Sequence, residues 1–136
     1  MIPRERFVAE ARKWIGTPYL HQGRNRHGVD CIGLLLVVGW ALGLTEYDVK
    51  GYGRTPNAGF LQTECERLMN RIDIDAARPG DVYLMRFTAD PQHLGIATER
   101  GIIHAWAGGA KRVAETSMPR SWRSRIVAAY AVPGVV

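Results

Sequence analysis

The residue with the most chemical potential in this chain is a cysteine at the start of a long apolar stretch. Asp30 precedes Cys31, and no charged residue follows as far as Thr45. An acidic residue directly before an apolar segment is typical of a helix N-cap. The first turn of a helix favours negative charge, which would lower the pKa of the Cys31 thiol and make it nucleophilic. The alternative is that Cys31 is a small buried hydrophobic residue, as many free cysteines are.

Two histidines lie on neighbouring predicted strands in the second half of the chain. Glu99–Gly101 form the tight turn between these strands. Across such a hairpin, two residues face each other when their numbers add up to about 200. Ala97 is therefore expected opposite Ile103. His93 and His104 then lie within a few residues of one another, and a bulge can complete their alignment. A neutral imidazole beside a thiol, held by a second polar group, is what a cysteine nucleophile requires. The alternative is one surface histidine and one buried histidine without a catalytic role.

The same three side chains also suggest a zinc site with one open position. The order of Cys31, His93 and His104 fits a thiol hydrolase better, and no carboxylate that would orient the histidines is identifiable. We therefore expect no metal and no other cofactor. The second cysteine, Cys65, has acidic neighbours on both sides, which oppose thiolate formation. We expect Cys65 to be inert packing.

Length and composition indicate an ordinary globular protein. With 136 residues, 46% of them hydrophobic and 23% charged, residues 1–136 are expected to form a single domain. The net charge of +5 suits an anionic partner such as a cell-wall polymer. The basic residues are scattered and are not interleaved with aromatic ones, which argues against specific nucleic-acid binding.

The chain offers no signal for a membrane or for export. The apolar run at 32–44 is shorter than the roughly 20 residues that a spanning helix needs. The N-terminus is charged from Arg4 onward, so we expect no signal peptide and a cytoplasmic location when the chain is made.

Hydrophobic periodicity changes from helical to strand-like along the chain. Helices are predicted first, at 3–15, 31–42 and 58–72, with loops at 17–29 and 45–58 and a turn at 78–81. Strands follow at 82–87, 93–98, 102–106, 112–115 and 126–132. Helices followed by strands favour an α+β domain with an antiparallel sheet of about five strands.

Five short motifs occur in order along the chain. They are Gly16-Thr17-Pro18-Tyr19, Asp30-Cys31-Ile32-Gly33-Leu34, Arg78-Pro79-Gly80-Asp81, His93-Leu94-Gly95-Ile96 and Ile103-His104-Ala105. In this order and spacing, the chain resembles the NlpC-type cell-wall cysteine peptidases from about Arg4 to Ala131. The resemblance implies a papain-like fold, in which the nucleophile helix packs on the antiparallel sheet. It also implies cleavage of peptide bonds in the stem peptides of bacterial peptidoglycan.

The resemblance assigns a role to each matching residue. Cys31 would be the nucleophile, His93 the general base and His104 the residue that orients His93. Tyr19 would match the family's substrate-site tyrosine, whose hydroxyl can help the Cys31 backbone N–H to hold an oxyanion.

Two departures from the family pattern concern the substrate. Family members usually have serine after the cysteine, and that serine and the preceding aspartate commonly hold a free amine of the substrate. Here the pair is Asp30 and Ile32, and the preceding loop carries His21-Gln22-Gly23 where an aromatic residue and two glycines are usual. Isoleucine cannot hydrogen-bond an ammonium group, so we expect the enzyme to tolerate or prefer substrates without a free N-terminal L-alanine close to the scissile bond. The alternative is that Asp30 alone holds the amine and the specificity is unchanged.

A short catalytic domain of this kind is similar to phage-encoded members of the family. The resemblance therefore implies peptidoglycan and other phage tail proteins as partners, and a virion tail or the cell wall as the place of action. Two alternatives stay open. One is an amidase or acyltransferase on the same scaffold, and the other is a non-catalytic or assembly-activated structural protein of a phage tail.

Overall fold

The computed structural model describes residues 1–54, 59–87 and 92–136. In these ranges the helices are α1 (Arg4–Arg12), α2 (Cys31–Ala41), α3 (Phe60–Leu68), the 3-10 helix η1 (Ile74–Ala76) and α4 (Arg120–Arg123). The strands are β1 (Arg24–Asn25), β2 (Gly28–Val29), β3 (Asn70–Ile72), β4 (Val82–Met85), β5 (His93–Thr98), β6 (Gly101–Ala105), β7 (Val113–Thr116) and β8 (Ile126–Ala131). The predicted α+β class is confirmed.

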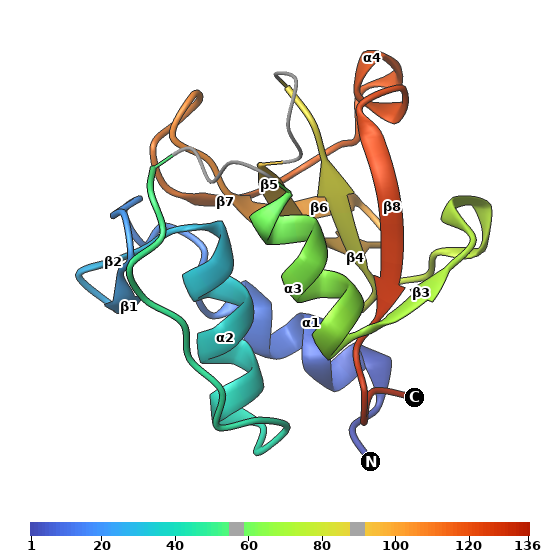
Figure 1. The fold of residues 1–136 in the computed structure, drawn as a ribbon, viewed down its shortest axis with the longest axis horizontal. Helices are drawn as coiled ribbons and strands as arrows, with labels where there is room; N and C mark the ends of the chain where they lie inside the picture. Colours follow the sequence, from blue (N-terminus) through green and yellow to red (C-terminus); the bar gives the residue numbers. More distant parts are fainter. Residues whose placement is uncertain (55–58, 88–91) are drawn as a thin grey trace.

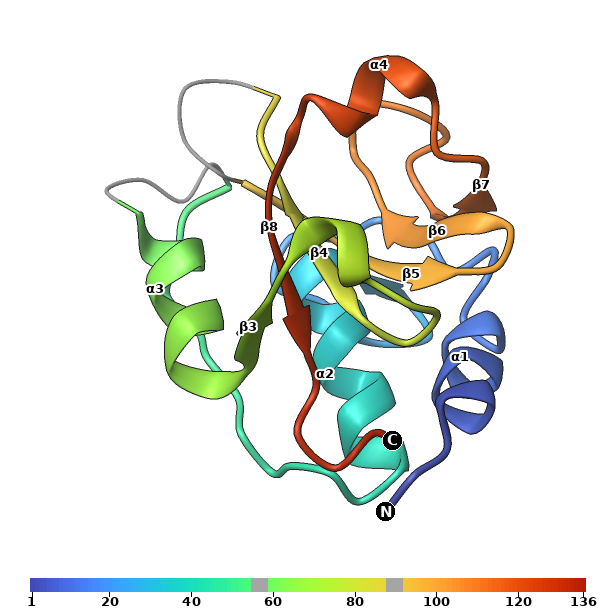
Figure 2. The same ribbon diagram turned by 90° about the vertical axis from the view of Figure 1, so that its right-hand side faces the viewer.

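The central helix, α2, begins where the sequence predicted. The Asp30 carboxylate accepts a hydrogen bond from the Gly33 backbone N–H at 2.7 Å, which caps the helix and fixes Cys31 as its first residue. One side of α2 packs with α1 and with Ile96 and Ile103 of the sheet. The other side packs with α3 and with strands β4 and β8. Because both sides of the helix are covered, it is apolar all round. Figure 2 shows α2 between α3 and α1, with strands β3, β4 and β8 in front of it, and Figure 1 shows α2 from the side.

The main sheet has six antiparallel strands in the order β3-β8-β4-β5-β6-β7. The sequence predicted all of them except β3, because residues 70–72 were assigned to the end of a helix at 58–72. That assignment was wrong: α3 ends at Leu68, and Met69 has an extended backbone. Asn70 then pairs with Ala131, so β3 covers the backbone hydrogen-bonding groups along the edge of β8. Residues 55–58, where the predicted loop ended and the predicted helix began, lie outside the described residues.

The hairpin of β5 and β6 has a register that differs by one from the expected one. Ile103 pairs with Ile96 instead of Ala97, because Gly101 belongs to β6 and the turn contains only two residues. Continuing this register sets His104 opposite Gly95, and His93 is two residues away on the same face. No bulge is needed to bring the histidines together. Gly95 contributes no side chain between them, and a Cβ there would stand 2.1 Å from Ile102 Cδ1.

The predicted loop at 17–29 contains a small hairpin that the sequence did not reveal. Strands β1 and β2 pair through Arg24 with Val29 and Asn25 with Gly28. This pairing places Arg24 beside Asp30, directly before α2. Among the described residues, no helix has both the length and the apolar character needed to cross a membrane.

Candidate active site

Cys31 lies at the N-terminal end of α2, against the beginning of β5. Its sulfur contacts the Gln92 carbonyl oxygen at 3.9 Å, and the Leu94 backbone N–H also interacts with it. Gln92 and Leu94 flank His93 in the chain, so the thiol lies against the backbone on both sides of that histidine. A direct contact between the sulfur and the His93 ring, expected within about 4 Å, stays a prediction.

The thiol of Cys31 is neutral at pH 7. Burial and the nearby Asp30 carboxylate raise its pKa to about 12. The backbone N–H groups of Cys31 and Ile32 at the helix N-terminus, and that of Leu94 on β5, lower the thiol pKa, but they do not offset the burial. The expected lowering of the thiol pKa is therefore overcome by desolvation. A nucleophilic sulfur must be produced by proton transfer to a neighbouring base.

His93 and His104 form a buried pair. Nε2 of His93 and Nδ1 of His104 are 2.7 Å apart, and the two residues are only 5% and 3% exposed. Burial lowers the pKa of His93 to about 3 and that of His104 to about 4, so both rings are neutral at pH 7. When His93 Nε2–H donates to His104, Nδ1 of His93 has a free lone pair and can accept a proton. The pair therefore has the form of a general base and the group that orients it.

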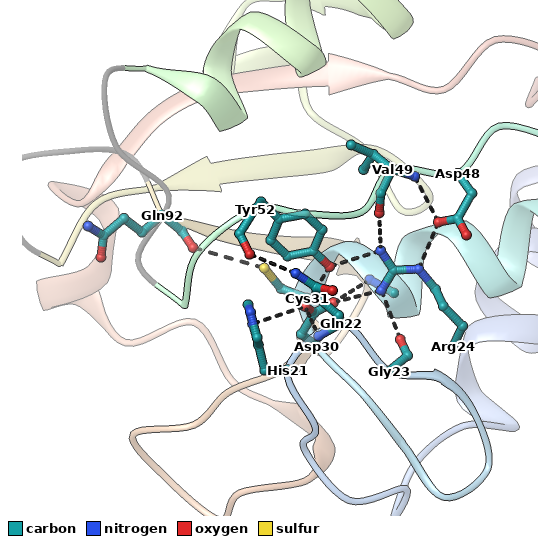
Figure 3. Close-up of polar contacts among 11 residues, drawn as sticks. His21, Gln22, Gly23, Arg24, Asp30, Cys31, Asp48, Val49, Tyr52 and Gln92 are labelled. Atoms are coloured by element: carbon teal, nitrogen blue, oxygen red, sulfur yellow. Dashed lines mark hydrogen bonds and ion pairs between the residues drawn. The ribbon is translucent and has the colours of Figure 1, made fainter.

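Asp30 does more than cap α2. Figure 3 shows that its carboxylate also accepts hydrogen bonds from the Gln22 backbone N–H at 2.8 Å and from the Tyr52 hydroxyl at 2.7 Å. Arg24 Nη1 lies 3.3 Å from the same carboxylate. Asp30 is 3% exposed, so internal donors already occupy both of its oxygens.

Arg24 is the internal counter-ion of Asp30, and its guanidinium is itself fully used. Its five N–H groups have five acceptors within 3.3 Å. These acceptors are the Asp48 carboxylate, the Gly23, Val49 and Asp30 oxygens and the Tyr52 hydroxyl. Arg24 therefore ties residues 48–52 to the N-terminus of α2. Neither Arg24 nor Tyr52 was predicted from the sequence.

The two other predicted substrate residues have different surroundings. Tyr19 is half-buried, and burial, with a contribution from the neighbouring acidic groups, raises its pKa to about 12. Its hydroxyl is therefore protonated at pH 7 and can donate a hydrogen bond. Ile32 is 8% exposed and lines an apolar cavity of about 190 Å³ between α2 and α3.

Comparison with known proteins identifies the family. The sequence pattern of the NlpC/P60 family matches residues 16–130, which is most of the chain. The chain belongs to the NlpC/P60 family. It is also 32% identical to Protein P54 of Enterococcus faecium over 99 residues, which is 72% of this chain and 17% of P54. The chain thus spans only a small part of that relative.

Solved NlpC/P60 structures share the fold. The NlpC/p60 domain of the peptidoglycan hydrolase SagA is 29% identical and has a TM-score of 0.67, covering 95% of this chain and 98% of that domain. The peptidoglycan hydrolase RipB of Mycobacterium tuberculosis is 15% identical with a TM-score of 0.66, covering 95% and 64% of the two chains. A Bacillus cereus NlpC/P60 protein is 18% identical with a TM-score of 0.68, covering 93% and 39%.

Cys65 of this NlpC/P60 domain lies on α3, in the apolar cluster against which Cys31 packs. It is 3% exposed, lines the cavity between α2 and α3, and has a pKa that burial raises to about 12. In the described part of the chain, no three His, Cys, Asp or Glu side chains come close enough together to hold a metal ion.

The buried histidines make the stability of the NlpC/P60 domain depend on pH. In the unfolded chain both titrate near 6.5, whereas their folded pKa values are about 3 and 4. Between about pH 4 and pH 6.5 the unfolded chain therefore binds more protons than the folded protein. The stabilisation is therefore complete above about pH 6.5 and is lost as the pH falls, by up to about 1.4 kcal/mol per pH unit for each histidine.

Urea unfolding of wild type and His104→Gln at pH 7 and pH 5 measures this effect. We expect a smaller loss of unfolding free energy on acidification in the variant. His27→Gln, in the exposed turn between β1 and β2, is the matched control and should lose as much as wild type. Equal losses in all three proteins would contradict a buried neutral pair.

Proposed function

We propose that this protein is a cysteine peptidase that hydrolyses peptide bonds in the stem peptides of bacterial peptidoglycan. The observation that carries the proposal is the position of Cys31 against the backbone around His93, whose ring is bonded to His104 at 2.7 Å. Membership of the NlpC/P60 family and the likeness to the NlpC/p60 domain of the peptidoglycan hydrolase SagA support it.

The chemistry follows from a thiol and an imidazole that are both neutral at rest. As the sulfur attacks the substrate carbonyl, the thiol proton passes to His93, and His104 holds the ring of the resulting imidazolium. The Cys31 backbone N–H and the Tyr19 hydroxyl donate hydrogen bonds to the developing oxyanion. The His93 imidazolium then protonates the leaving amine, and a thioester forms. Water hydrolyses the thioester after giving its proton to His93, which restores the thiol.

Digestion of purified peptidoglycan, with mass spectrometry of the released fragments, tests the proposal. Hydrolysis leaves a new carboxylate and a new amine at one stem-peptide bond, whereas an acyltransferase leaves the acyl group joined to an added amine acceptor. Cys31→Ala protein is the control for contaminating hydrolases. If no fragment is released either by the chain alone or by assembled particles that contain it, the protein is structural and the peptidase proposal is wrong.

The hydrogen bonds and the ion pair that Asp30 already makes within the protein favour a substrate without a charge near the scissile bond. Arg24, shared with Asp48, and three further donors already occupy the oxygens of this carboxylate, and Ile32 offers no hydrogen bond. A free ammonium group would lose its hydration here without gaining a partner, which is costly. We propose that the enzyme tolerates or prefers stems that are still amide-linked to the glycan over free stem peptides.

The comparison of kcat/KM on matched free and glycan-linked stem peptides tests this preference. We expect the linked peptide to be cleaved at least as well by wild type, and Ile32→Ser alone to leave the ratio within about threefold because Arg24 still occupies Asp30. A clear wild-type preference for the free peptide would refute the prediction.

We also propose that the chain works as part of a phage or prophage tail and acts at the cell wall. A preference for intact, glycan-linked stems would suit an enzyme that meets the wall from outside. Mass spectrometry of tails purified from an induced culture of the source organism tests this assignment, and absence of the chain from such tails would exclude it.

A further inference from the structure

Three aromatic side chains gather around the histidine pair. They are Phe87, which follows β4, Trp106, which follows β6, and Trp122 of α4. Phe87 lies edge-on to His93 with ring centroids 5.9 Å apart, and Trp106 is stacked on His104 at 5.9 Å with 22° between the planes. Trp122 lies edge-on to His104 at 5.5 Å. These three residues are called the aromatic cover below.

The members of the aromatic cover also contact each other. Phe87 and Trp106 are stacked at 5.4 Å, Trp106 and Trp122 are edge-on at 5.0 Å, and Phe87 and Trp122 are edge-on at 5.1 Å. Offset stacked and edge-on arrangements at these distances are favourable for aromatic rings. The cover is therefore a packed unit and not three separate surface residues.

Trp122 is the one residue of helix α4 that is not exposed. The helix is only four residues long, none of them is buried, and no side chain caps its N-terminus. Trp122 is half-buried, whereas the other residues of α4 are exposed. From this short helix the indole reaches both His104 and Trp106.

Trp106 is held in place by a glycine pair. A Cβ atom added at Gly108 or Gly109 would stand 3.1 Å or 3.0 Å from the indole ring, which is closer than nearly all real contacts of this kind. The backbone of these glycines can therefore lie directly against the ring. This contact fixes the plane on which His104 stacks.

The histidine pair needs such support. A single hydrogen bond of 2.7 Å joins the rings, and the torsion that turns an imidazole about its Cβ–Cγ bond has broad minima. Aromatic rings on His104 from two directions restrict that rotation and keep water away from the bond. Such an environment also disfavours a charged imidazole, in agreement with the low pKa values of both rings.

We propose that Trp122 and Trp106 are positioning residues, which fix the ring of His104 so that it orients His93 as the general base. The inference rests on the proposed peptidase function for its catalytic meaning, although the positioning can be measured without turnover. Among the described residues, the guanidinium of Arg125 lies 5.7 Å from the centre of the Phe87 ring, and the Cys31 thiol on α2 contacts the Gln92 carbonyl directly before His93.

Two readouts on Trp122→Leu test the proposal. In NMR titrations of the ring nitrogens, we expect His104 and His93 to titrate closer to pH 6.5 than in wild type. In kinetics, we expect the acid limb of the kcat/KM profile to move in the same direction, and kcat at neutral pH to fall about tenfold with KM unchanged. Trp122→Phe keeps an aromatic ring and should restore most of both properties.

Trp40→Leu is the matched control. It also removes a half-buried indole, whose N–H donates a hydrogen bond to the Tyr47 carbonyl oxygen, but this indole contacts neither histidine. It should leave the titration of both rings as in wild type. Trp106→Leu gives a second, independent variant. If both cover variants fold and their histidines titrate as in wild type, the positioning role is excluded. If wild type cleaves no peptidoglycan but the ring titrations shift as expected, the peptidase function fails while the positioning stands.

Discussion

Replacement of Cys31 by alanine or serine is expected to abolish turnover of peptidoglycan, by about 10⁴-fold or more, while the protein folds as wild type. Alanine removes the atom that forms the thioester. Serine keeps a hydrogen-bonding group, but a hydroxyl is harder to ionise than a thiol and is a poorer nucleophile in a site built for sulfur. Fragment release from purified peptidoglycan measures turnover, and circular dichroism with urea unfolding measures the fold.

Cys65→Ser is the control for this prediction. Cys65 is 3% exposed on α3 and lies outside the hydrogen bonds of the histidine pair, so its replacement should leave turnover nearly intact. A hydroxyl in the apolar cavity should lower the free energy of unfolding by about 1–2 kcal/mol, since it lacks a good partner there. Equal loss of turnover in both cysteine variants would indicate a structural or metal-binding role for the thiols.

Local sequence signals predicted the elements that hold the candidate site. Helix α2 could be located because an acidic cap and an uninterrupted apolar run are signals contained in adjacent residues. The hairpin of His93 and His104 was predictable for the same reason. Its register was wrong by one residue because Gly101 was counted in the turn, and a one-residue shift changes which face a side chain occupies.

Features that depend on distant segments were not predictable from the sequence. Arg24 meets Asp30 only because β1 and β2 pair, and Tyr52 reaches the same carboxylate from a segment without regular structure. The state of the Cys31 thiol is a second example. Its position on the helix was predicted, but its pKa depends on burial against β5, and desolvation outweighs the helix N-terminus.

The two histidines are expected to differ in their effect on turnover. His93→Gln removes the group that accepts the thiol proton, and because burial raises the thiol pKa to about 12, almost no thiolate is present without that base. We expect kcat/KM to fall by about 10²–10⁴-fold. His104→Gln keeps a side-chain oxygen that can accept the hydrogen bond from His93, so we expect a loss of about tenfold.

The pH dependence of the residual activity separates these roles. Without His93, hydroxide must remove the thiol proton, so the residual kcat/KM of His93→Gln should rise steadily as the pH increases toward the thiol pKa. His104→Gln should keep a profile with an acid limb, because His93 still titrates. Thioester formation in single turnovers, measured alongside steady-state rates, shows whether the loss lies in the attack by sulfur. Equal losses in the two variants, or a steadily rising profile for His104→Gln, would mean that His93 is not the base that activates Cys31.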